Sequence, residues 1–287
     1  MDVFAAFIAP ALAGVFVGVM SGLLGVGGGT IMVPIFRLAF GMSPLASTAT
    51  SLFAIIPTSI SGVVAHTRAK TCVPKLGLAL GVGGAVMSPV GVWLASVSPG
   101  WLVICVAAVV IGFSAFKMFK KAVKCAPAPR AGKEGGSAQS AAANAATSGH
   151  PSPKPVPDQP HLSRKQYLQG ACIGLVAGLA SGYVGVGGGF IMVPLMLAIL
   201  DIPMTLASGT SLIAIMILAI PGVIEQGLLG NIDYLTGIAI VVGSIPGALV
   251  GARLVRVVPE RQLRFIFGGF LLVAAVMLML NEFGILG

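Results

Sequence analysis

Charged residues are scarce in this chain of 287 residues. Aspartate, glutamate, lysine and arginine make up 9% of the sequence, whereas hydrophobic residues make up 56%. Ordinary soluble domains carry roughly 25% charged residues, so the composition excludes that class. The stretches without charge are long enough for membrane-spanning helices, which need about 20 apolar residues each. The sequence therefore predicts an all-α integral membrane protein that is multi-pass.

The sequence also lacks the residue groups on which catalysis and metal binding depend. It has no paired carboxylates at a shared site, no Ser/His/Asp set and no cluster of metal-ligand spacing. The four cysteines have no CxxC spacing, and we expect them to pack as small side chains rather than to form a disulfide or a metal site: Cys72, Cys105, Cys125 and Cys172. We expect no enzymatic activity, no metal and no cofactor.

One unusual element occurs twice. Residues 21–34 read SGLLGVGGGTIMVP and residues 181–194 read SGYVGVGGGFIMVP, with eleven of fourteen positions identical at an offset of 160. The same offset aligns Thr50 and Ser51 with Thr210 and Ser211, and Pro99 with Pro259. The chain is therefore predicted to consist of two homologous helical halves, residues 1–125 and 162–287.

Each half is expected to contain five apolar segments. In the first half these cover about residues 3–24, 30–40, 45–66, 76–96 and 101–119, with a glycine hinge at residues 25–29 between the first two. Whether those two segments cross the membrane fully or form a hairpin broken near its middle stays open. Residues 126–161, rich in Pro, Ala, Gly and Ser, are predicted to form a flexible cytoplasmic linker.

The charges predict how the halves are oriented. Of the net charge of +9, seven units lie between Lys117 and Lys165, which indicates a cytoplasmic segment near anionic lipid rather than a nucleic-acid site. The loop after residue 66 is basic, whereas its counterpart in the second half contains Glu225 and Asp233. Basic loops face the cytoplasm, so an inverted repeat with external termini is predicted. His66 and Glu225 are expected to belong to these loops.

The hinge is predicted to form a substrate site. Three consecutive glycines cost about 1 kcal/mol each relative to alanine in a helix, and non-helical backbone within a membrane is tolerated only around protein or a water-filled cavity. Paired breaks in inverted halves are typical of transporter binding sites, and the helix N-terminus after each break favours an anion. The candidate substrate-binding residues are Ser21, Gly25, Gly27, Gly28, Gly29, Thr50, Ser51, Ser181, Gly185, Gly187, Gly188, Gly189, Thr210 and Ser211.

Other residues near the hinge have competing interpretations. Arg37 is either an anion contact or a side chain that reaches the membrane interface. Pro34 and Pro194 are assigned to the hinges. Tight helix packing is favoured for Gly14, Gly18, Gly62, Gly83 and Gly222. A dinucleotide-binding loop is discounted, because the flanking strand, the later acidic residue and a P-loop lysine are all missing.

The twin elements GxxSGxxGVGGGxxMVP, the Thr-Ser pair that follows each, and the two membrane halves joined by a hydrophilic linker resemble the sulfite exporter TauE/SafE family. The resemblance implies a bacterial or archaeal inner-membrane transporter of sulfite, sulfonates or related small organic anions, driven by an ion gradient. It carries over to Ser21, Gly25, Pro34, residues 27–29 and their counterparts Ser181, Gly185, Pro194 and residues 187–189. The long Pro/Ala-rich linker departs from the family pattern.

The leading hypothesis is a secondary transporter of a small sulfur-containing oxyanion that works by alternating access in the cell inner membrane. The partners are then the anionic substrate, a coupling proton or sodium ion, and membrane lipid, with no nucleic acid. Two alternatives stay open at this point. One is a passive anion channel that uses the hinges as a selectivity filter, and the other is a membrane sensor or scaffold without flux.

Overall fold

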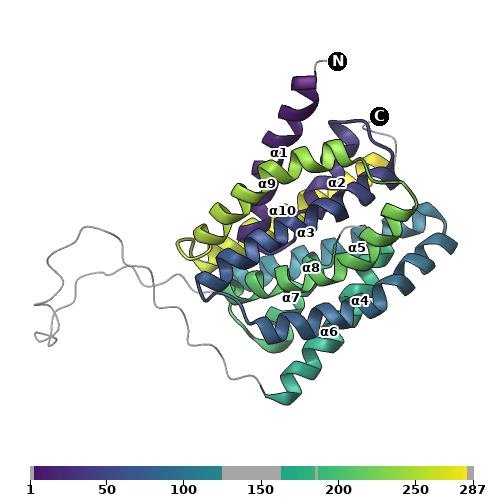
Figure 1. The fold of residues 1–287 in the computed structure, drawn as a ribbon. Helices are drawn as coiled ribbons and strands as arrows, with labels where there is room; N and C mark the ends of the chain where they lie inside the picture. The colour runs from purple at the N-terminus through teal and green to yellow at the C-terminus, as the bar shows by residue number, and fades with distance from the viewer. Residues whose placement is uncertain (1–2, 125–162, 185–186, 283–287) are drawn as a thin grey trace, which may run out of the picture.

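The computed structural model describes residues 3–124, 163–184 and 187–282, and all regular structure in these ranges is helical. The first half contains α1 (Val3–Leu24), α2 (Gly29–Leu38), α3 (Pro44–Arg68), α4 (Pro74–Val97) and α5 (Gly100–Lys124). The second half contains α6 (Arg164–Val184), α7 (Gly189–Leu195), the π-helix η1 (Met196–Leu200), α8 (Met204–Leu228), α9 (Tyr234–Leu254) and α10 (Glu260–Glu282). Figure 1 shows their arrangement. The predicted all-α class is confirmed.

Five of the described helices are long and apolar enough to cross a membrane, by length and composition. These spans are Phe7–Leu24, Leu45–Arg68, Pro74–Leu94, Met204–Leu228 and Tyr234–Leu254. Large apolar side chains such as Trp93, Phe113 and Phe116 lie exposed on the helices, as lipid-facing residues do. The structure thus supports a multi-pass membrane protein. The predicted linker, residues 126–161, lies outside the described residues, and the limits of the two halves stay a prediction.

Two helices begin at side-chain caps. Ser43 accepts a hydrogen bond from the Ala46 N–H at 3.2 Å, and Pro44 follows it at the first helical position of α3, where its missing N–H is not needed. Asp233 caps α9 by accepting from the N–H groups of Leu235 and Thr236 at 3.1 and 3.2 Å. These caps fix where the long helices start after each loop.

The first helix of each half packs against the fourth helix of the other half, α1 on α9 and α6 on α4. Glycine makes this close approach feasible: a Cβ atom at Gly18 would overlap the carbonyl oxygen of Ser244, and one at Gly178 would overlap that of Gly84. These two contacts are equivalent at the offset of 160. The packing role predicted for Gly18 is confirmed.

The other glycines expected to serve packing also lie in close contacts. Added Cβ atoms would meet backbone carbonyl oxygens at Gly14 and Gly83, and leucine side chains at Gly62 and Gly222. Glycines one helical turn apart allow helix backbones to approach one another in a membrane. The packing interpretation is therefore confirmed for Gly14, Gly18 and Gly83, which approach backbone carbonyl groups. It stays a prediction for Gly62 and for Gly222, which also lines a cavity.

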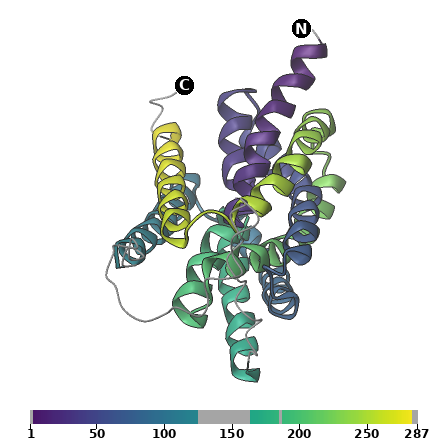
Figure 2. The same cartoon turned by 90° about the vertical axis from the view of Figure 1, so that its left-hand side faces the viewer.

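Two threonines exchange hydrogen bonds between the halves. The Val73 N–H donates to Thr210 Oγ1 at 3.0 Å, and the Asp233 N–H donates to Thr50 Oγ1 at 3.0 Å. Each donor and each acceptor is related to its counterpart by the offset of 160. In Figure 2, α1 (purple) runs down from the top of the view and α6 (teal) runs up from the bottom, so these equivalent helices are antiparallel. The assignment of their ends to the two membrane faces stays a prediction.

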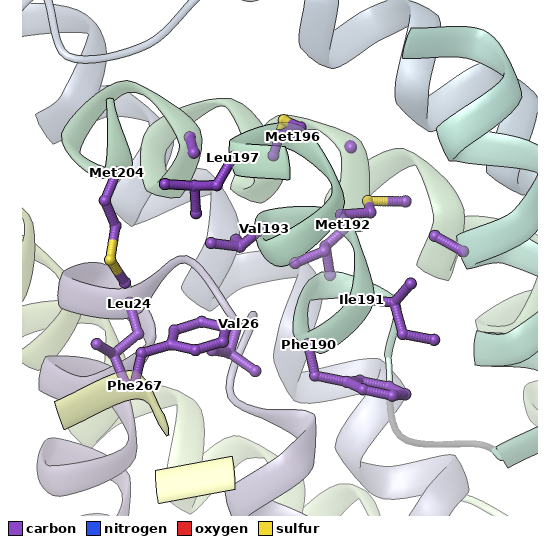
Figure 3. Close-up of a cluster of buried hydrophobic side chains, with 14 of the residues drawn as sticks. Leu24, Val26, Phe190, Ile191, Met192, Val193, Met196, Leu197, Met204 and Phe267 are labelled. Carbon is purple, nitrogen blue, oxygen red and sulfur yellow. The ribbon is translucent and has the colours of Figure 1, made fainter. Parts of the chain in front are cut away.

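The core is centred on α7, the helix that follows the second hinge. Phe190, Met192 and Val193 are fully buried there, in one cluster with Leu24 and Val26 of the first half. Figure 3 shows this cluster, in which Phe267 of α10 also takes part. The second hinge is consequently anchored in the middle of the molecule, against the end of α1.

Candidate functional site

The first hinge breaks the chain between α1 and α2. Gly25, Gly27 and Gly28 have φ values of 71°, 80° and 82°, in the left-handed region that glycine adopts without steric penalty. α2 then starts without a side-chain cap on Gly28. The Ile31 N–H donates to Gly28 O at 3.0 Å, so the two N–H groups before it, those of Gly29 and Thr30, lie at the N-terminus without helical acceptors. This geometry favours an anion or a water at the N-terminus of α2.

The two hinges touch each other. A Cβ atom at Gly189 would lie 2.8 Å from Gly25 O and 2.8 Å from Val26 Cα, closer than real side chains come. Ser211 reinforces this junction, because its hydroxyl donates to Gly25 O at 2.6 Å. Glycine at 189 is therefore required by a close approach, and the structure brings the two predicted elements to one place.

Two buried hydroxyls beside the first hinge have no protein partner. Ser21 is 0% exposed and Thr30 is 2% exposed, and in the described part of the chain neither side-chain oxygen makes a hydrogen bond. Ser21 faces the hinge, since a Cβ atom at Gly28 would lie 3.8 Å from Ser21 Cβ. Leaving a buried hydroxyl unpaired costs about 1–3 kcal/mol, so these two groups are suited to a ligand or a water.

A cavity of about 110 Å³ reaches the second hinge. This volume is well above the roughly 10–15 Å³ that one water needs. Its polar wall combines hydroxyl, carboxylate and amide groups from α3, α4, α6 and α8: Thr48, Ser88, Ser181, Glu225 and Gln226. Gly187, with a φ of 84°, also lines it. No basic side chain lines this cavity within the described ranges.

The family model described as "Sulfite exporter TauE/SafE" matches residues 10–278. The chain belongs to this family. It is similar to two Bacillus subtilis (strain 168) proteins named as probable membrane transporters. YunE is 26% identical over 258 residues, covering 87% of this chain and 89% of the relative. YdhB is 28% identical over 248 residues, covering 86% and 89% respectively. No solved structure matches the chain. The chain is thus a membrane transporter of the TauE/SafE family.

Two residues of this TauE/SafE protein lie elsewhere than the sequence predicted. His66 belongs to the last turn of α3 and is 0% exposed, and Glu225 belongs to the last turn of α8 and lines the cavity. The expectation that both belong to loops is wrong, because the two helices continue past the residues where the hydropathy falls. At the offset of 160, His66 aligns with Gln226, the residue after Glu225. This alignment is the signal that could have assigned both residues to equivalent positions in the repeat.

The Thr-Ser pairs mostly connect protein groups. Thr50 and Thr210 carry the bonds between the halves described above. Ser51 donates to Thr48 O at 2.8 Å. Ser211 has one hydroxyl proton and two acceptors within reach, Gly25 O at 2.6 Å and Ser208 O at 2.8 Å. Of these four hydroxyls only that of Ser211 contacts a described hinge residue. Their role as direct substrate ligands stays a prediction, and their observed role is to hold the hinges and the halves together.

Arg37 lies at the far end of α2 from the hinge. It follows Gly29 by eight residues, or about 12 Å along the axis at 1.5 Å per residue. Its role as an anion contact stays a prediction. Pro34 lies inside α2 and Pro194 inside α7. Proline lacks an N–H, so Pro34 leaves the Thr30 carbonyl without its helical donor.

The second hinge differs from the first in detail. Gly188 has a φ of −74°, in the right-handed region, whereas its counterpart Gly28 has a φ of 82°, in the left-handed region. Gly185 lies outside the described residues. Thr30 was missed by the sequence reasoning, because it aligns with Phe190 and breaks the repeat. Its place directly after the triple glycine, in the first turn of α2, is the signal that could have found it.

Proposed function

We propose that this TauE/SafE protein is a secondary transporter that moves a small sulfur-containing oxyanion across the cell inner membrane by alternating access. One observation carries the proposal. The two hinges touch through Gly189 and Gly25, yet the described cavity reaches only the second of them, through Ser181 and Gly187. Two hinges in contact with each other, of which only one borders the described cavity, are what alternating access requires in one of its states.

The chemistry around the hinges suits an oxyanion. The N-terminus of α2 offers backbone N–H groups and the positive end of the helix dipole. The hydroxyls of Ser21 and Thr30 beside it are buried and without partners among the described residues. These donors are neutral, so they bind an oxyanion without the strong attraction of a buried arginine. Release of the substrate on the other side is then easier.

The difference between the two serines supports a defined orientation of this state. Ser21 is fully buried, while its counterpart Ser181 lines the cavity. The cavity extends to Glu225 and Gln226 in the last turn of α8. By the charge rule, the acidic loop after α8 faces outside. We therefore assign the described state to an outward-accessible form in which the inner path is closed.

Glu225, on the wall of the cavity, is a candidate site for the coupling ion. An ionised carboxylate on the cavity wall repels an anion, and no basic side chain lines the cavity to compensate within the described part of the chain. A cation bound near Glu225 removes this repulsion. We assign Glu225 as the residue at which a proton or sodium ion assists anion entry.

The test is a substrate panel in vesicles that contain the purified full chain. Sulfite and small sulfonates should accumulate against their concentration gradient when a proton or sodium gradient is imposed. Flux that only follows the anion gradient would identify a passive channel, and binding without flux would identify a sensor or scaffold. Gly28→Val and Gly188→Val should abolish transport, whereas Gly112→Val, at a helical glycine with open space around it, should not.

A further inference from the structure

His66 fastens the end of α1 to the end of α3. Its ring is 0% exposed. Nε2 lies 2.8 Å from the carbonyl oxygen of Gly22, and Nδ1 lies 2.7 Å from the hydroxyl of Thr71. Because a carbonyl oxygen only accepts, Nε2 donates to Gly22, and the neutral ring then accepts the Thr71 hydroxyl at Nδ1. This His66 latch, made of His66, Thr71 and Gly22, closes directly behind Ser21.

The latch also rests against the second half. A Cβ atom at Gly209 of α8 would lie 2.9 Å from both Cγ and Nδ1 of His66 and would overlap the carbonyl oxygen of Thr71. Glycine at this position lets α8 approach the latch closely. The end of α1, the end of α3 and the start of α8 therefore meet at one point, and the first hinge lies behind it.

The second half contains the same three positions in a different state. At the offset of 160, His66, Thr71 and Gly22 correspond to Gln226, Asn231 and Gly182. The amide of Asn231 donates to Gln226 Oε1 at 2.8 Å, which reproduces the contact between Thr71 and His66. Gln226 and Gly182 both line the cavity, and no hydrogen bond joins them in the structure described.

The chemistry of the two side chains is equivalent. In the latch, residue 66 accepts from residue 71 with one atom and donates to the carbonyl of residue 22 with another. Gln226 already accepts from Asn231 through Oε1, which leaves its amide nitrogen as the donor. That nitrogen is the group suited to the Gly182 carbonyl when the cavity closes.

We propose that His66 and Gln226 are the two gate residues of this transporter. His66 bonded to Gly22 closes the path to the first hinge, and Gln226 detached from Gly182 leaves the path to the second hinge open. In the opposite state the first bond is broken and the second is made. His66 is a positioning residue, and the inference rests on the alternating access proposed above.

The experiment measures access to the two hinge serines, without any substrate. Ser21→Cys or Ser181→Cys is introduced into the full chain with its native cysteines replaced by alanine. Each protein is labelled with a small charged methanethiosulfonate in vesicles of defined sidedness. With His66 present, Ser181→Cys should react with reagent added on the side of the membrane where the C-terminal end of α8 lies. Ser21→Cys should not react from either side.

His66→Ala should reverse this pattern. The ratio of the two labelling rates should change by about tenfold, the order expected when one buried hydrogen bond between two states is lost. His66→Gln should restore the original ratio, because glutamine forms the equivalent contacts in the second half. Gln226→His should stabilise the contact between residue 226 and the Gly182 carbonyl, and this should protect Ser181→Cys from labelling. A residue that only stabilises the fold would not move the two rates in opposite directions.

Unchanged labelling in His66→Ala and in Gln226→His would overturn the proposal. Equal loss of the pattern in His66→Ala and His66→Gln would also overturn it. If His66→Ala fails to fold, as seen by size-exclusion chromatography, the remaining two variants decide. Because labelling requires no substrate, failure of the vesicles to transport any sulfur oxyanion counts against the proposed function alone.

Discussion

Gly189→Ala should force the two hinges apart. The new Cβ would lie 2.6 Å from Ile215 Cδ1, 2.8 Å from Gly25 O and 2.8 Å from Val26 Cα. Two of these three neighbours are backbone atoms, which cannot turn away as a flexible side chain can. Inserting one methyl group into a packed interior costs about 1–3 kcal/mol. A shift of that size changes an equilibrium by about 5- to 150-fold.

The assay compares transport with stability in the same preparation. Initial rates of sulfite or sulfonate uptake in vesicles should fall by at least about fivefold in Gly189→Ala, the lower bound of that range. The apparent melting temperature in detergent should fall by only a few degrees, because the core around α7 is otherwise retained. Gly112→Ala is the matched control, since a Cβ there meets nothing within 4 Å.

A wild-type transport rate in Gly189→Ala, with an unchanged melting temperature, would refute this reasoning. It would mean that the contact between Gly189 and Gly25 is absent from the functional protein. A fall in transport together with a large loss of folded protein would instead assign Gly189 to stability alone. A lower rate with the fold intact would place the contact between the hinges in the transport cycle.

Two further changes test the connections around the site. Thr210→Val removes the acceptor for the buried Val73 N–H, so the free energy of unfolding in detergent should fall by about 1–3 kcal/mol. Thr50→Val should have the same effect, because it removes the acceptor for the Asp233 N–H. If both variants are as stable as the wild type, these hydrogen bonds do not connect the halves. Glu225→Gln should raise the transport rate in the absence of a cation gradient and make the rate less dependent on that gradient. The measurement is uptake at several pH values and sodium concentrations. Asp233→Asn is the control, because the Asp233 carboxylate caps α9 and does not line the cavity; this variant should keep the wild-type dependence, and a wild-type dependence in Glu225→Gln would contradict the coupling role.

The helix positions were predictable from the sequence, because a long segment without charged residues is compatible with the hydrocarbon interior of a membrane. Residues 3–24 were expected as the first segment and form α1. The break after it followed from three consecutive glycines, which a membrane helix does not contain without a reason. The close contact at Gly18 was also predictable, since glycine spacing marks the face of a helix that packs.

Other features could not be read from the sequence. Glycine spacing shows which face packs but does not name the partner, so the pairing of α1 with α9 was not predicted. A threonine hydroxyl is the same group whether it binds a substrate or a backbone N–H, and Thr50 and Thr210 proved to connect the halves. His66 was assigned to a loop because Arg68 and Lys70 follow it, whereas only the tertiary structure brings the Gly22 carbonyl to its ring.

The pairing of α1 with α9 has a consequence for how the protein is made. Among the described residues, the glycine face of α1, formed by Gly14, Gly18 and Gly22, packs on α9, which is synthesised about 200 residues later. The newly inserted first half must therefore hold α1 in the bilayer with that face against lipid. α6, in contrast, finds α4 already in place when it enters the membrane. The two equivalent helix pairs therefore form in a fixed order, and α1 acquires its partner only after α9 has been synthesised.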